Sequence, residues 1–122
     1  MGKLTGKIAV VTGAAKGIGA AAAERFLADD VEIVALVDMN LEMAQETAKR
    51  LEPTGTRAFA FGCNVANPLE VERCFGEIES RFGRIDVLVN SAGINRDKTM
   101  IKMTEEEWQA VIDVDQIGRA HV

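Results

Sequence analysis

Cysteine, basic charge and long apolar runs are all scarce in this sequence of 122 residues. The two cysteines, Cys63 and Cys74, have neither the spacing of a metal site nor the density of a disulfide scaffold, so we expect both to be small apolar side chains that are buried or half-buried. The net charge of −5 argues against nucleic acid or an anionic membrane as a partner, because both attract a basic surface. No apolar run approaches the ~20 residues of a membrane-spanning helix. The N-terminal residues also lack the pattern of a secretory signal, and we therefore expect a cytoplasmic protein.

The bulk composition is typical of one globular domain. Hydrophobic residues make up 48% of the chain and charged residues 27%, a balance that argues against an intrinsically disordered protein. The length suffices for one core, but not for a nucleotide-binding domain together with a separate substrate domain. We therefore expect residues 1–122 to form a single domain.

Short apolar runs alternate with helical patterns along the sequence. Runs expected to form strands occupy residues 8–11, 33–37, 58–61 and 87–89. The helix after the second run is expected to turn inward Leu41, Ala44, Ala48 and Leu51. Asn67 followed by Pro68 is typical of a helix start, and Thr104 with Glu107 forms a capping box in front of a fourth helix. Strands that are apolar throughout are buried on both faces, and their alternation with helices makes them parallel, so the pattern predicts a doubly wound α/β sheet of the Rossmann type in strand order 3-2-1-4.

A glycine-rich motif lies between the first expected strand and the first expected helix. Residues 12–19 read Thr-Gly-Ala-Ala-Lys-Gly-Ile-Gly, and the helix start would offer free backbone N–H groups and partial positive charge to a pyrophosphate. Gly13, Gly17 and Gly19 permit the tight turn and the close approach of the backbone. Asp38 ends the second strand at the spacing of a dinucleotide-binding fingerprint, which favours that site over a turn used only for helix packing. A P-loop is excluded, because no Gly-Lys-Ser/Thr follows the first glycine at the required offset.

Two charged residues bear on the choice between NAD and NADP. Asp38 is placed to accept hydrogen bonds from the ribose hydroxyls of adenosine, and its charge would repel a 2′-phosphate. Lys16 acts in the opposite direction, since a cation beside the phosphates could also reach a 2′-phosphate, although it could equally be a solvated loop residue. NAD is the predicted cofactor, and NADP stays open.

With these residues in hand, the chain resembles the short-chain dehydrogenase/reductase family, in particular its β-ketoacyl reductases, over about residues 5 to 118. The resemblance implies that Asn64 and Val65 border the adenine, and that the central part of the cofactor is lined by Asn90, Ala92 and Gly93. The family usually has Asp at position 64 and a second Asn where this chain has Ser91. The predicted cofactor-binding set is therefore Gly13, Lys16, Gly17, Ile18, Gly19, Asp38, Asn64, Val65, Asn90, Ala92 and Gly93.

The catalytic residues of that family are not found in this sequence. The family uses a Tyr, a Lys four residues beyond it, a Ser and an Asn, and this chain contains no tyrosine. Asp115 aligns with the Asn, and the single histidine, His121, has no partner in the sequence. We predict no catalytic residue and no metal ligand. The expectation is an oxidoreductase by descent, truncated after four strand–helix units to its cofactor-binding half and inactive alone.

Other interpretations stay open beside this one. A module without catalysis could bind an adenine nucleotide or only self-associate. A Rossmann methyltransferase is weaker, because its glycine loop usually begins with an acidic residue where this chain has Thr12. Besides a dinucleotide, we expect a second copy of the chain as a partner, because the family's further strand would cover residues 87–89 and its next helix would cover Trp108, Val111 and Ile112.

Overall fold

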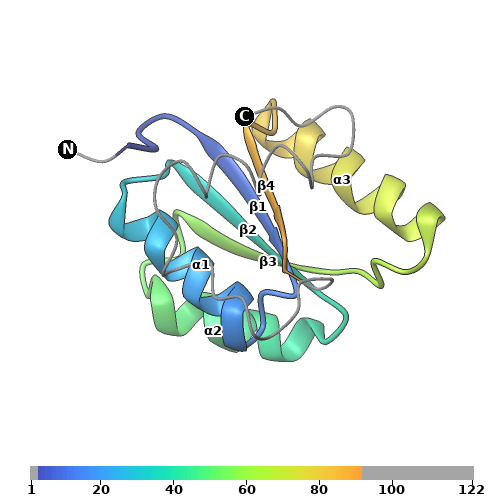
Figure 1. The fold of residues 1–122 in the computed structure, drawn as a ribbon. Helices are drawn as coiled ribbons and strands as arrows, with labels where there is room; N and C mark the ends of the chain where they lie inside the picture. Colours follow the sequence, from blue (N-terminus) through green and yellow to red (C-terminus); the bar gives the residue numbers. More distant parts are fainter. Residues whose placement is uncertain (1–2, 92–122) are drawn as a thin grey trace.

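The computed structural model of the chain describes residues 3–91, which form an α/β fold around one parallel sheet (Figure 1). The strands are β1 (Ile8–Thr12), β2 (Ile33–Asp38), β3 (Ala58–Gly62) and β4 (Val87–Asn90). They are hydrogen-bonded in the order β3-β2-β1-β4, and every pairing is parallel. The helices between them are α1 (Gly17–Ala28), α2 (Leu41–Leu51) and α3 (Pro68–Phe82). The predicted fold class and strand order are therefore confirmed.

The sheet is covered on both faces, as a doubly wound arrangement requires. Helices α1 and α2 lie against one face, and α3 lies against the other (Figure 1). Successive residues of β1 consequently face opposite layers: Val11 packs in one core cluster with Phe26 of α1, whereas Val10 packs in the other with Phe75 of α3. Because β1 lies between β2 and β4, all its residues are buried. This position explains why β1 is apolar everywhere except at its last residue.

Each strand extends one residue beyond the apolar run that predicted it. The additional residues are Thr12, Asp38, Gly62 and Asn90. A parallel ladder is made by backbone groups, so a polar side chain or a glycine at its end does not interrupt it. Since the carboxyl ends of parallel strands meet at one edge of the sheet, the polar side chains among these residues are brought to that edge.

Two local predictions are confirmed, one about the start of α3 and one about the two cysteines. Asn67 caps the helix, and its side-chain oxygen accepts from the N–H groups of Leu69 and Glu70 at 3.0 and 3.3 Å. Cys63 and Cys74 are free thiols, and both are buried in the core between the sheet and α3. The cysteines therefore act as apolar core side chains.

Leu41 departs from the inward stripe predicted for α2. It is 41% exposed, whereas Ala44 and Ala48 on the same helix are buried. As the first residue of α2, Leu41 lies at the open end of the sheet, where its side chain rests on Gly62. A Cβ built on Gly62 would lie 3.2 Å from the Cβ of Leu41, so the glycine leaves room for this contact.

Glu52 stabilises the loop between α2 and β3, a role that the sequence pattern did not predict. Its Oε1 atom accepts from the backbone N–H groups of Thr56 and Arg57 at 2.9 and 2.8 Å, and from that of Ala58 at 3.3 Å. The Thr54 hydroxyl donates to the other carboxylate oxygen. Burial opposes ionisation of Glu52, but these donors outweigh it and hold the pKa of the carboxyl below its ordinary value. The loop is therefore folded around an ionised side chain.

Several predictions concern residues outside those that the structure describes. They include Ala92, Gly93, Trp108 and the capping box at Thr104. Among residues 3–91, none of the helices has the length and apolar character needed to cross a bilayer. The cytoplasmic location stays a prediction.

Candidate functional site

The candidate site lies at the carboxyl edge of the sheet, around the end of β1. Thr12 is paired in register with Val37 of β2 on one side and with Asn90 of β4 on the other. Strand order reverses at this point, since β2 and β3 lie on one side of β1 and β4 lies on the other. Open α/β sheets bind ligands in the crevice that forms where the order reverses.

The N-terminus of α1 points into this edge without a side-chain cap. Lys16 occupies the N-cap position in extended conformation and makes no capping hydrogen bond, and the first turn of α1 contains no acidic residue. The other two described helices differ, because Asn40 caps α2 and Asn67 caps α3, and each has a glutamate in its first turn. The first N–H groups of α1 and its positive dipole end are thus left for an anion.

The glycines of the loop have the conformations that such a site needs. Gly13 and Gly17 both have φ of 63°, in the left-handed region that favours glycine. Gly19 serves close packing instead, since a Cβ built on it would lie 2.1 Å from the carbonyl oxygen of Gly13 and 2.6 Å from the hydroxyl oxygen of Ser91. The loop would have to move to admit any side chain at position 19. Ile18, which lies between Gly17 and Gly19, is half-buried against the core.

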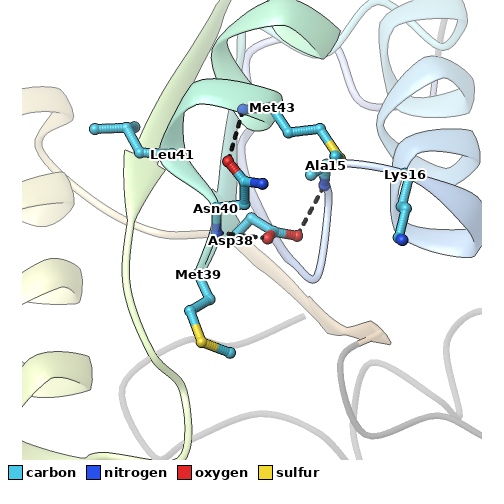
Figure 2. Close-up of a pocket in the computed structure, with 7 residues that line it drawn as sticks. All are labelled: Ala15, Lys16, Asp38, Met39, Asn40, Leu41 and Met43. Carbon is cyan, nitrogen blue, oxygen red and sulfur yellow. Dashed lines mark hydrogen bonds between the residues drawn. The ribbon is translucent and has the colours of Figure 1, made fainter.

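Asp38 connects this loop to the start of α2. Its Oδ2 atom accepts from the backbone N–H of Ala15 at 3.0 Å, and its Oδ1 atom accepts from that of Asn40 at 2.9 Å (Figure 2). Each carboxylate oxygen keeps a further lone pair, so the group can still accept hydrogen bonds from a ligand. These contacts hold the carboxylate at the edge of the sheet and fix the position of its negative charge.

A pocket of about 580 Å³ opens beside Asp38. Figure 2 shows its lining residues, which are Ala15, Lys16, Asp38, Met39, Asn40, Leu41 and Met43. Lys16 and Asp38 both line it, and no ion pair joins them in the described part of the chain. Met39 is 73% exposed and gives the pocket an apolar surface. The pocket therefore combines a hydrogen-bond acceptor, a cation and an apolar wall.

The sequence of residues 7–122 matches the family model described as short chain dehydrogenase. The chain belongs to the short-chain dehydrogenase family. The resemblance drawn from the glycine motif is thus confirmed. Over 118 residues it is 40% identical to a 3-oxoacyl-[acyl-carrier-protein] reductase of Synechocystis, which covers 97% of this chain and 48% of that protein. The chain spans less than half the length of the curated relatives it matches.

This short-chain dehydrogenase chain is also similar to solved structures. One is L-sorbose reductase from Gluconobacter frateurii complexed with NADPH and L-sorbose, with a TM-score of 0.68 and 34% identity over 86% of this chain and 40% of that one. Another is a short-chain dehydrogenase/reductase from Burkholderia phymatum in complex with NAD, with a TM-score of 0.66 and 27% identity over 73% of this chain and 31% of that one.

Three further predicted site residues of this short-chain dehydrogenase, Asn64, Val65 and Asn90, are not among those that line the pocket. Asn64 follows β3, where its side-chain oxygen accepts from the Ala66 N–H at 2.9 Å, and Val65 beside it is 37% exposed. Asn90 ends β4, and its side-chain oxygen accepts from the Thr12 hydroxyl at 2.6 Å. The structure thus brings Lys16 and Asp38 into one pocket. It places Asn64 and Val65 after β3 and Asn90 at the end of β4, and these two strands are separated by β2 and β1.

Some residues of the site were not predicted from the sequence. Met39, Asn40 and Met43 line the pocket, and a signal for them was present, because any residue directly after Asp38 starts at the same edge of the sheet. Ser91 was noted only as a departure from the family, but its hydroxyl donates to the backbone oxygens of Thr12 and Gly13. The same hydroxyl oxygen is one of the atoms that exclude a side chain at position 19.

No metal centre is found in the part of the chain that the structure describes. Residues 3–91 contain no group of three or more histidine, cysteine, aspartate or glutamate side chains that could hold a metal ion. What the site offers chemically is anion binding at a helix N-terminus and hydrogen-bond acceptance at Asp38.

Proposed function

We propose that this chain binds a nicotinamide dinucleotide at the carboxyl edge of its sheet, as the cofactor-binding part of an oxidoreductase. The observation that carries the proposal is the uncapped N-terminus of α1 next to the carboxylate of Asp38. A dinucleotide needs both features, one for its pyrophosphate and one for its adenosine ribose. Family membership and the cofactors of the two solved relatives, NADPH in one and NAD in the other, support this assignment.

The cofactor-binding residues are proposed to act in three groups. Gly13, Gly17 and Gly19 let the backbone approach the pyrophosphate, together with the N–H groups at Lys16 and Ile18. Asp38 accepts from the ribose hydroxyls. Asn64 and Val65 border the adenine, and the central part of the cofactor is lined by Asn90, Ala92 and Gly93, the last two of which lie outside the described residues.

We further propose that NAD is preferred over NADP. The charge of Asp38 is held in place by two backbone N–H donors, so it cannot easily move away from a 2′-phosphate. Lys16 is exposed and flexible by comparison, and it would accommodate the additional phosphate only in part. The fixed carboxylate therefore outweighs the lysine.

Isothermal titration calorimetry of the purified chain with NAD, NADP and ATP tests these proposals. We expect saturable heat with NAD, weaker binding of NADP, and a relaxed preference in Asp38→Ala. The matched control is Asp29→Ala, which removes a carboxylate from the opposite end of α1. No heat with either dinucleotide would refute the binding site, and tighter binding of NADP than NAD would refute the role of Asp38. Equal binding of ATP would favour a general adenine-nucleotide module.

We assign no catalytic residue to this chain, because the family's catalytic tyrosine has no counterpart in a sequence without tyrosine. General acid catalysis typically contributes at least about 10²-fold, so ketone reduction by this chain alone should be undetectable. Turnover that follows the purified chain, and that disappears in Gly13→Asp, would contradict this assignment.

A further inference from the structure

Thr47 is a buried polar residue in the middle of α2. It is only 5% exposed, although its neighbours Glu46 and Lys49 are exposed. Its hydroxyl donates to the backbone oxygen of Ala15, which lies 32 residues earlier, in the glycine-rich loop. A threonine hydroxyl in a helix often bonds to its own helix, so a bond to a distant loop indicates a tertiary function.

The bond from Thr47 completes a set of contacts that fixes the loop just before α1. The Ala14 N–H donates to the Val37 oxygen at 3.2 Å, and the Ala15 N–H donates to Asp38 at 3.0 Å. With Thr47 on the carbonyl oxygen, both backbone polar groups of Ala15 are bonded. Ala14 and Ala15 are buried, whereas the next residue, Lys16, is exposed. The anchored segment therefore ends where the N–H groups offered to the phosphates begin.

Without this bond, the peptide that joins Ala15 to Lys16 would be less constrained, while the bonds donated by the Ala14 and Ala15 N–H groups would remain. Gly13 and Gly17 flank the anchored segment, and rotation at glycine meets little steric resistance. Loss of the Thr47 hydroxyl would leave the Ala15 oxygen buried without a partner, which favours turning that peptide toward water. Such a rotation also turns the adjoining N–H of Lys16, and the donors at the start of α1 would no longer converge.

We propose that Thr47 is a positioning residue, which holds the glycine-rich loop in the conformation that receives the phosphates of the dinucleotide. The proposal rests on the proposed function, because it assigns Thr47 a part in that same binding site. Its contribution to affinity is preorganisation: a loop that is already in place does not have to be ordered when the ligand binds.

The test compares Thr47→Val, which keeps the shape and removes the hydroxyl, with Thr47→Ser, which keeps the hydroxyl. We expect Thr47→Val to weaken NAD binding by about threefold to tenfold, the value of one hydrogen bond, and Thr47→Ser to restore most of the affinity. Thr54→Val is the matched control, because it removes the same kind of hydroxyl from a bond to Glu52 away from the loop. That variant should bind NAD like the wild type.

Amide hydrogen exchange supplies a second readout that does not depend on NAD. In Thr47→Val we expect faster exchange at Ala14 and Ala15, with the amides of α2 unchanged. Unaltered NAD affinity and unaltered loop exchange in Thr47→Val would overturn the proposal, as would an equal loss in Thr54→Val. If the wild-type chain does not bind NAD at all, the proposed function fails, and the exchange rates alone decide whether Thr47 fixes the loop.

Discussion

The carbonyl oxygen of Gly13 lies 2.1 Å from the point that a Cβ on Gly19 would occupy. No side chain fits there without a movement of the backbone, since the nearest atom in conflict belongs to the main chain. The third glycine of the motif is therefore required for packing of α1 against the end of β1, and it needs no unusual backbone angle.

Gly19→Ala is expected to lower the free energy of unfolding by about 1–3 kcal/mol, as overpacking does in a well-packed core, and to weaken NAD binding through displacement of the loop. Urea denaturation and calorimetry measure the two effects. Gly76→Ala is the control, because position 76 lies in α3 and the new Cβ would have no atom from outside that helix within 4 Å. That change should be neutral or stabilising by up to ~1 kcal/mol, and an equal loss in both variants would contradict the packing argument.

Glu52→Gln should destabilise the chain at neutral pH by about 1–2 kcal/mol, because hydrogen bonds to a charged acceptor are stronger than those to an amide. The folded pKa of Glu52 is lowered, so its contribution is complete above its ordinary value of 4.5 and is lost as the pH falls through the folded pKa. The difference between Glu52→Gln and the wild type should accordingly narrow below pH 4.5. A difference that does not change with pH would show that the ionised form contributes nothing.

The two cysteines should be inert in the folded chain. Burial raises the pKa of the Cys63 thiol above 9.0, and burial together with the neighbouring Cys63 raises the pKa of Cys74 to about 12. Both thiols then stay protonated at neutral pH, where an aromatic disulfide reagent should react with neither until the chain is unfolded. Because these pKa values are raised, stability should fall as the pH rises above 9.0, where the unfolded thiols ionise. Rapid reaction of one native thiol would contradict the burial.

Self-association is the expected state at micromolar concentration. Among the described strands, β4 pairs only with β1, which leaves an edge of the kind that pairs with another chain. Leu88 of β4 is 1% exposed, so a charged residue there would test folding rather than association. Sedimentation equilibrium should detect a dimer that Trp108→Glu weakens, and a monomer at tens of micromolar would refute the prediction.

The apolar pattern was sufficient to predict the four strands and their order. Strands β1 and β2 are buried on both faces, and burial on both faces requires the nearly continuous apolar runs that the sequence shows there. The roles of Thr47 and Glu52 were not predictable in this way. In the sequence both are ordinary polar residues on or after an amphipathic helix, and only the folded chain brings Ala15 or the loop at Thr56 to them. Their burial depends on contacts between distant segments, which periodicity does not report.

Because the start of α1 has no side-chain cap, the melting temperature of the chain should depend on whether a ligand is bound there. An aspartate or serine in place of Lys16 would supply a cap worth typically about 1 kcal/mol and would raise the melting temperature of the empty chain. The same side chain would compete with a phosphate for the same N–H groups. The chain with Lys16 lacks this stabilisation when no ligand is bound. Its melting temperature should rise with the logarithm of ligand concentration. At position 16, an aspartate or serine would favour the stability of the ligand-free chain, whereas a lysine leaves the N–H groups open for a phosphate.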